Sequence, residues 1–122
     1  MPNQLLLYIG AALPIIWGAA HLFPTASVIK GFGDISTDNK KIIAMEWITE
    51  GVALIFIGVI VAGVTIIDAA SKVSEFIYIS SAAVLIVLAV VSLFTGFKVR
   101  FLPFKLCPLL FTLSAVLILI GY

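Results

Sequence analysis

Four long apolar segments constrain this chain more than any other feature. They cover residues 5–23, 42–67, 76–97 and 103–122, and each has 19 to 26 residues. A hydrocarbon core about 30 Å thick needs about 20 helical residues at about 1.5 Å each, so every segment can cross it as a helix. A membrane β-barrel would show alternating segments of about 10 residues instead. The sequence therefore predicts an all-α membrane protein with four transmembrane helices.

The overall composition supports a membrane protein and excludes several other classes. Of 122 residues, 63% are hydrophobic and 11% are charged, which is far from the balance of a soluble domain. The net charge of +1 gives no basic surface for nucleic acid, so we expect no nucleic-acid partner. Cys107 is the single cysteine, which excludes an intrachain disulfide and a cysteine-based metal site. The length fits one domain, residues 1–122.

The connections between the segments predict how the helices are arranged. The first connection, residues 24–41, is 18 residues long, whereas residues 68–75 and 98–102 form short turns. Short turns make neighbouring helices antiparallel. The predicted fold is therefore an antiparallel four-helix bundle within a single transmembrane domain.

The basic residues predict the orientation of this bundle. One side carries six of them, while the other side carries only Lys72. Because cytoplasmic loops carry an excess of Lys and Arg, we expect an inner (plasma) membrane protein with loop 24–41 in the cytoplasm and both termini outside it. Five of the six are expected to set this topology or to bind lipid headgroups. These five are Lys40, Lys41, Lys98, Arg100 and Lys105.

Two carboxylates open the second apolar segment. Glu46 and Glu50 are four residues apart, so they project from the same helix face. Residues 52–67 supply only 16 residues, about 24 Å of helix, which is shorter than the core. The span must therefore begin at or before Glu50, which places that carboxylate near the inner boundary of the core. An ionisable group at such a depth is costly and is expected to have a partner or a function.

The first helix offers a partner for these carboxylates. His21 lies near the inner end of that helix, one turn beyond Trp17, and Trp47 also falls on the inner side. His21 can face either glutamate if the long loop folds back between the helices. The expected ligand-binding residues are His21, Glu46, Glu50, Trp17 and Trp47.

A structural interpretation of the same residues stays open. Glu46 and Glu50 can be solvated residues at a helix N-terminus, where the helix dipole favours negative charge. His21 can be an interfacial residue bonded to a loop carbonyl. Its ring and the two carboxylates supply three metal donors, but the chain has no second histidine, so we expect no metal and no cofactor.

Two further residues bear on helix packing. Pro14 lies mid-span in the first helix, where it should kink the helix and open space for an apolar ligand. Gly58 and Ala62 form a small-xxx-small pair that suits close contact between helices.

The run Trp17-Gly18-Ala19-Ala20-His21, together with the length and the four spans, resembles the small four-helix membrane proteins grouped as DoxX-like. This resemblance implies a bacterial or archaeal inner-membrane protein and carries over no functional residues. More distantly, intramembrane carboxylates paired with His and Trp are similar to the sterol-isomerase and sigma-2-receptor type of bundle. That type binds apolar amines and sterols, but here both glutamates share one helix.

Three functions follow as alternatives. The first is a non-enzymatic protein that binds a small molecule, lipid or cation in the cytoplasmic half of the bundle, as a homo-oligomer or as a subunit of a larger membrane assembly. The second is an isomerase-like membrane enzyme in which Glu50 and His21 perform acid/base chemistry on an apolar lipid. The third is a purely structural membrane subunit. Convergence of His21 and Glu50 on a cavity would favour binding or catalysis over the structural role.

Overall fold

The computed structural model describes all residues, 1–122, and contains helices but no strands. Four of the helices are long and apolar enough to cross a membrane, which confirms the all-helical prediction and the number of candidate spans. A fifth, short helix lies in the first connection, and one 3-10 turn follows the third long helix. In chain order the elements are α1 (Gln4–Leu22), α2 (Thr25–Gly31), α3 (Thr37–Asp68), α4 (Lys72–Phe94), η1 (Gly96–Lys98) and α5 (Leu102–Gly121).

Capping serines explain where two helices begin earlier than the apolar pattern indicates. The Ser36 hydroxyl accepts a hydrogen bond from the Asn39 amide at 3.1 Å, so α3 begins at Thr37 rather than at residue 42. The Ser71 hydroxyl accepts from the Ser74 amide at 3.1 Å and starts α4 at Lys72 rather than at residue 76. Polar first turns extend both helices beyond their apolar segments, because a cap satisfies the otherwise unpaired amides there.

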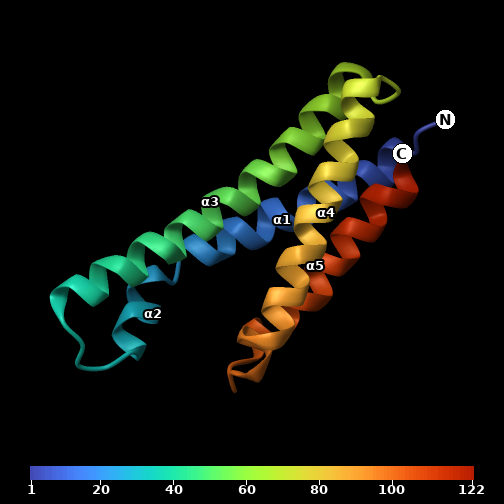
Figure 1. Cartoon of the computed structure of the whole chain (residues 1–122). Helices are drawn as coiled ribbons and strands as arrows, with labels where there is room; N and C mark the ends of the chain where they lie inside the picture. Colours follow the sequence, from blue (N-terminus) through green and yellow to red (C-terminus); the bar gives the residue numbers. More distant parts are fainter.

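The long helices form two packed pairs that diverge from one another (Figure 1). Helix α1 lies along α3, and α4 lies along α5, while α1 also packs against α5. The pairs meet at the end that holds both termini and the α3–α4 turn, which we call the closed half. They separate toward α2 and the α4–α5 turn, which we call the splayed half.

Hydrogen bonds between helices join the two pairs in the closed half. The Asn3 amide donates to the Gly121 carbonyl at 2.6 Å and ties the two termini together. The Ser114 hydroxyl donates to the Gly10 carbonyl at 2.7 Å, from α5 to α1. The Thr65 and Tyr78 hydroxyls lie 2.9 Å apart between α3 and α4, and both residues are buried. Small and hydroxyl-bearing residues thus allow close approach there, as in other membrane helix bundles.

Glycines hold α1 against α3 along the length of the pair. A Cβ atom added at Gly18 would lie 2.6 Å from the Gly51 carbonyl oxygen, and one added at Gly58 would collide with the Ala11 carbonyl. Gly58 therefore lies at a close helix contact, and Ala62 packs against the core one turn later. This contact makes α1 and α3 one unit even where α4 and α5 have moved away.

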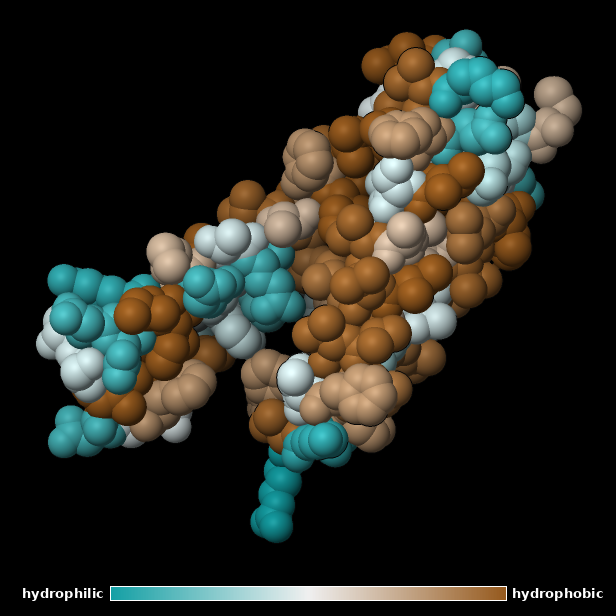
Figure 2. All heavy atoms as spheres, in the orientation of Figure 1, coloured by the Kyte–Doolittle hydropathy of each residue, from teal (hydrophilic) through white to brown (hydrophobic).

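The surface of the molecule is largely apolar between its two ends (Figure 2). Only 24 of the 122 residues are buried, so most apolar side chains face outward. Phe56, Ile66 and Val87, for example, are 62%, 72% and 61% exposed. Water would solvate such a surface poorly, whereas lipid chains would solvate it well.

Candidate functional site

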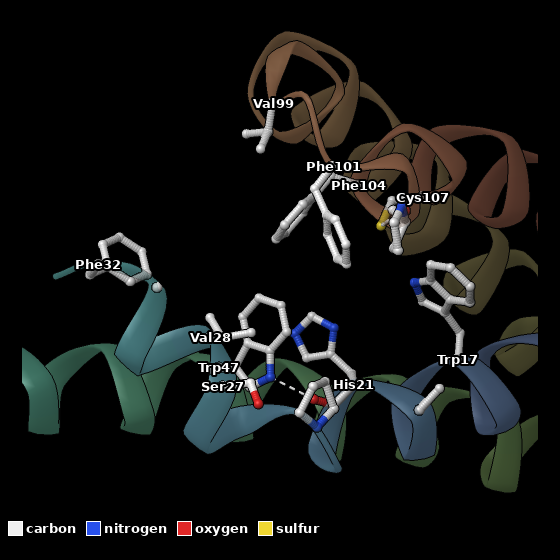
Figure 3. Close-up of a pocket in the computed structure, with 14 residues that line it drawn as sticks. Trp17, His21, Ser27, Val28, Phe32, Trp47, Val99, Phe101, Phe104 and Cys107 are labelled. Carbon is white, nitrogen blue, oxygen red and sulfur yellow. Dashed lines mark hydrogen bonds between the residues drawn. The ribbon is translucent and has the colours of Figure 1, made fainter.

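A cavity of about 810 Å³ occupies the splayed half, between the two diverging helix pairs (Figure 3). The hollow between the pairs is also visible from outside in the space-filling view (Figure 2). One wall comes from α1, α2 and α3, and the other comes from the α4–α5 turn and the start of α5. The lining residues are Trp17, Ala20, His21, Pro24, Ser27, Val28, Gly31, Phe32, Trp47, Val99, Phe101, Pro103, Phe104 and Cys107.

His21 is the most buried polar side chain of this cavity, with 8% of its surface exposed. It lies in the last turn of α1, where carbonyl groups have no partner within the helix. The Trp47 indole of α3 donates a hydrogen bond to the His21 carbonyl at 2.5 Å. The same indole stacks on the imidazole, with ring centroids 3.7 Å apart and planes 14° from parallel. Trp47 therefore fixes both the backbone and the ring of His21.

Glu50 approaches His21 from the same helix as Trp47. Trp47 and Glu50 are three residues apart on α3, so they share a face of that helix. Glu50 Oε2 lies 3.2 Å from His21 Nε2. The pair does not have the geometry of a hydrogen bond, and the buried Nε2 atom has no hydrogen-bond partner. Glu50 keeps 45% of its side chain exposed and does not line the cavity. The carboxylate thus lies behind the histidine, away from the space that a ligand would occupy.

The structure brings together some of the predicted binding residues and leaves others apart. Trp17, His21 and Trp47 line the cavity, and Glu50 contacts one of them from outside it. Glu46 is exposed, forms no ion pair and lies outside the cavity. Of the two glutamates, only Glu50 therefore belongs to the site.

The aromatic second wall is the part of the site that sequence reasoning missed. Phe104 meets Trp47 edge-on at 5.9 Å across the cavity, and Phe101 meets Phe104 edge-on at the same centroid distance. Figure 3 shows both phenylalanines facing the His21 and Trp47 side. Val28 of α2 and Phe32, directly after that helix, add to the opposite wall; their spacing of four residues was a helical signal within the predicted loop 24–41.

Pro14 has a different role from the one expected. The proline lies inside α1 and is fully buried, but it does not line the cavity. The space between the helices comes instead from the divergence of the two pairs farther along α1, at Trp17 and His21.

No family model, curated protein or solved structure matches this chain. The resemblance to DoxX-like proteins therefore stays a prediction.

The basic residues of the splayed half differ in what they contact. Lys98 and Arg100 are exposed and flank Val99, which lines the cavity. The Lys105 ammonium donates to the Phe97 carbonyl at 2.8 Å and lies 4.8 Å from the centre of the Phe97 ring. Lys40 and Lys41 are exposed on the first turns of α3 and line no part of the cavity.

The donor set of the site suits an apolar ligand better than a metal ion. No three His, Cys, Asp or Glu side chains are grouped closely enough to hold a metal. The cavity wall is formed mainly by aromatic and aliphatic carbon, and His21 is the one ionisable side chain of the wall besides the Cys107 thiol.

Proposed function

We propose that this chain is a multi-pass membrane protein that binds an apolar molecule, a lipid or a lipid-like compound, in the cavity of the splayed half. The observation that carries the proposal is a cavity of about 810 Å³ with an apolar, aromatic wall and one buried imidazole. Ligand sites are typically about 300–1,000 Å³, mostly apolar, with few polar groups placed to orient the ligand. The rigid support of His21 by Trp47 is what such an orienting group requires.

The same proposal places the chain in the inner membrane as an antiparallel bundle with both termini outside the cytoplasm. The six-to-one distribution of Lys and Arg supports this orientation. A span of about 20 residues counted back from Ile67 reaches Ile48, so His21 and Glu50 would lie at the cytoplasmic edge of the core. The gap between the pairs would then open sideways into the inner leaflet and give a lipid chain direct access. Cysteine labelling at Tyr122 tests the orientation; a cytoplasmic C-terminus would contradict it.

Both tryptophans of the chain line the cavity, so their fluorescence can report on its occupancy. We expect a brominated long-chain alcohol, such as dibromostearyl alcohol, to quench this fluorescence in a saturable way in nanodiscs of unbrominated phosphatidylcholine. Bromine quenches only at short range, so saturable quenching requires the chain to enter beside Trp17 or Trp47.

A pair of matched variants separates the cavity from the general lipid surface. Ala20→Phe fills part of the cavity and should abolish saturable quenching, because Ala20 lines it. Ala53→Phe makes the same change at an exposed α3 position outside the cavity and should leave quenching unchanged. Equal, non-saturating quenching in both variants would overturn the proposal and favour a purely structural subunit.

A second candidate function is an enzyme that moves a proton on the bound molecule. It is favoured by one observation, the 3.2 Å approach of Glu50 to the buried His21 Nε2. A carboxylate behind an imidazole can hold the ring in one orientation, while the ring exchanges the proton. Only His21 would touch the substrate, since Glu50 lies outside the cavity. Recovery of chemically unchanged molecules after extended incubation with membrane extract would exclude this candidate and leave binding intact.

A further inference from the structure

We infer that the molecule held in the cavity is an acidic amphiphile, whose acyl chain enters the cavity and whose anionic headgroup is recognised by Lys98 and Arg100 at its rim. The inference deepens the proposed function and rests on it. The ligand then carries a negative headgroup in addition to its apolar chain.

Uncompensated positive charge at the rim carries the inference. The six acidic residues of the chain all precede Phe76, so α5 and the α4–α5 turn contain none. The only ion pairs of the chain are His21 with Glu50 and Lys72 with Glu75, and they leave Lys98 and Arg100 unpaired. No carboxylate of the chain therefore forms an ion pair with Lys98 or Arg100.

The rim cations adjoin the apolar wall. Val99 and Phe101 line the cavity, and Lys98 and Arg100 alternate with them along the turn. Val99 has an extended backbone, with φ −74° and ψ 142°, so successive side chains point to opposite sides. The apolar residues thus face the cavity, while the cations remain outside it at the level where a headgroup would lie.

Two other features of the rim favour an anion. Helix α5 begins there with no side-chain cap at Phe101, which leaves the positive end of its dipole unneutralised. On the opposite wall, the exposed Lys30 precedes the lining residues Gly31 and Phe32 and has no ion-pair partner. Each wall therefore carries a positive group next to residues that line the cavity.

Lys105 contributes less to this recognition than its charge suggests. Its ammonium already donates to the Phe97 carbonyl and lies over the Phe97 ring. An anion would have to compete with these contacts, whereas Lys98 and Arg100 are free to bind one. The inference therefore rests on those two residues.

Relative quenching by brominated lipids of different charge tests the inference. Brominated phosphatidylglycerol is compared with brominated phosphatidylcholine, and dibromostearate in alkaline buffer is compared with dibromostearyl alcohol. Because each cation near the membrane surface strengthens anion binding about fivefold, we expect Lys98 and Arg100 together to give each anionic probe a preference of roughly 25-fold. Preference for phosphatidylglycerol alone identifies a phospholipid, and preference for stearate alone identifies a free fatty acid; either result supports the inference.

Charge-matched double variants identify the residues responsible. Lys98→Gln with Arg100→Gln should abolish the roughly 25-fold preference while leaving quenching by the neutral probes unchanged. Lys40→Gln with Lys41→Gln removes the same charge from α3, outside the cavity, and should keep the preference. The inference is overturned if neutral and anionic probes quench the wild-type protein equally, or if both double variants lose the preference alike. Absence of saturable quenching by every probe would instead contradict the proposed function.

Discussion

The closed and splayed halves are built from the same four long helices but hold them in opposite ways. In the closed half, small and hydroxyl-bearing side chains bring the pairs into contact, and Tyr78 is fully buried between them. In the splayed half, aromatic rings line both walls of a cavity, and Phe104 reaches Trp47 only edge-on. Stability is therefore concentrated at one end of the molecule, and space for a ligand at the other.

The cavity can remain open because the helices around it are held elsewhere. The α1–α3 pair is fixed by glycine contacts along its length, and the termini are joined by the hydrogen bond from Asn3 to Gly121. The splayed half is therefore held by the rest of the fold and does not need to pack against itself. A site with one orienting imidazole can then form on rigid helices, as precise binding requires.

The largest expected effect comes from loosening the α1–α3 pair. Gly58→Ala places a methyl group against the Ala11 carbonyl, so a helix backbone must shift and the free energy of unfolding should fall by about 1–3 kcal/mol. Gly63→Ala is the matched control on the same helix, because no atom lies within 4 Å of its added Cβ. It should be neutral or stabilising by up to about 1 kcal/mol. Reversible unfolding in detergent micelles compares the two; equal destabilisation would refute the close contact.

A smaller effect is expected from the closed half alone. Ser114→Ala removes the hydroxyl that donates to the Gly10 carbonyl. The contact between α5 and α1 should therefore be weakened by about 0.6–1.7 kcal/mol. Ser80→Ala, on α4, is the control, since Ser80 is only partly buried. Hydrogen exchange of α1 and α5 amides reports the change locally. Faster exchange confined to the splayed half would show that the Ser114 hydrogen bond does not stabilise the closed half.

The splayed half depends on Trp47 in two separable ways. Trp47→Phe loses the hydrogen bond to the His21 carbonyl but keeps an aromatic ring for stacking, so it should cost about 0.5–1.5 kcal/mol. Trp47→Leu loses both contacts and should cost more. Either variant leaves Trp17 as the only fluorescent reporter of the cavity. Identical unfolding free energies for the two variants would mean that stacking on His21 contributes nothing.

The smallest effect on stability is expected at Glu50. The carboxylate is half-exposed and is not in hydrogen-bond geometry with His21, so Glu50→Gln should change the unfolding free energy by less than about 1 kcal/mol. Binding of the brominated alcohol should weaken about fivefold or less, because Glu50 acts on the ligand only through His21. Glu46→Gln removes the same charge one turn earlier, where no partner is lost, and should change neither quantity. A complete loss of binding in Glu50→Gln alone would place the carboxylate in direct contact with the ligand.

The helices could be predicted from the sequence because membrane spans require long apolar runs, and four such runs are present. The ends of these helices were predicted less accurately, because caps such as Ser36 extend a helix through polar residues that hydropathy assigns to a loop. The short helix α2 was missed because its seven residues, Thr25–Gly31, are too few to form a long apolar run.

The site could be predicted only in part. Depth along the helices was enough to predict that His21 lies near Glu50 and Trp47, because residues at equal depth on neighbouring helices can meet. Depth says nothing about which side chains reach a cavity: Glu46 and Glu50 both lie outside its wall, and ligand binding by Glu46 stays a prediction. The wall formed by Phe101 and Phe104 depends on how the two helix pairs diverge, and no local pattern encodes that angle.

A structure of the protein purified with its native lipids retained would show whether the splayed half holds an apolar molecule against His21. We expect continuous, elongated density that runs between Trp17 and Phe104, contacts the His21 ring and ends at the rim beside Arg100. A cavity filled only by ordered water, or helix pairs closed onto each other without a cavity, would contradict it.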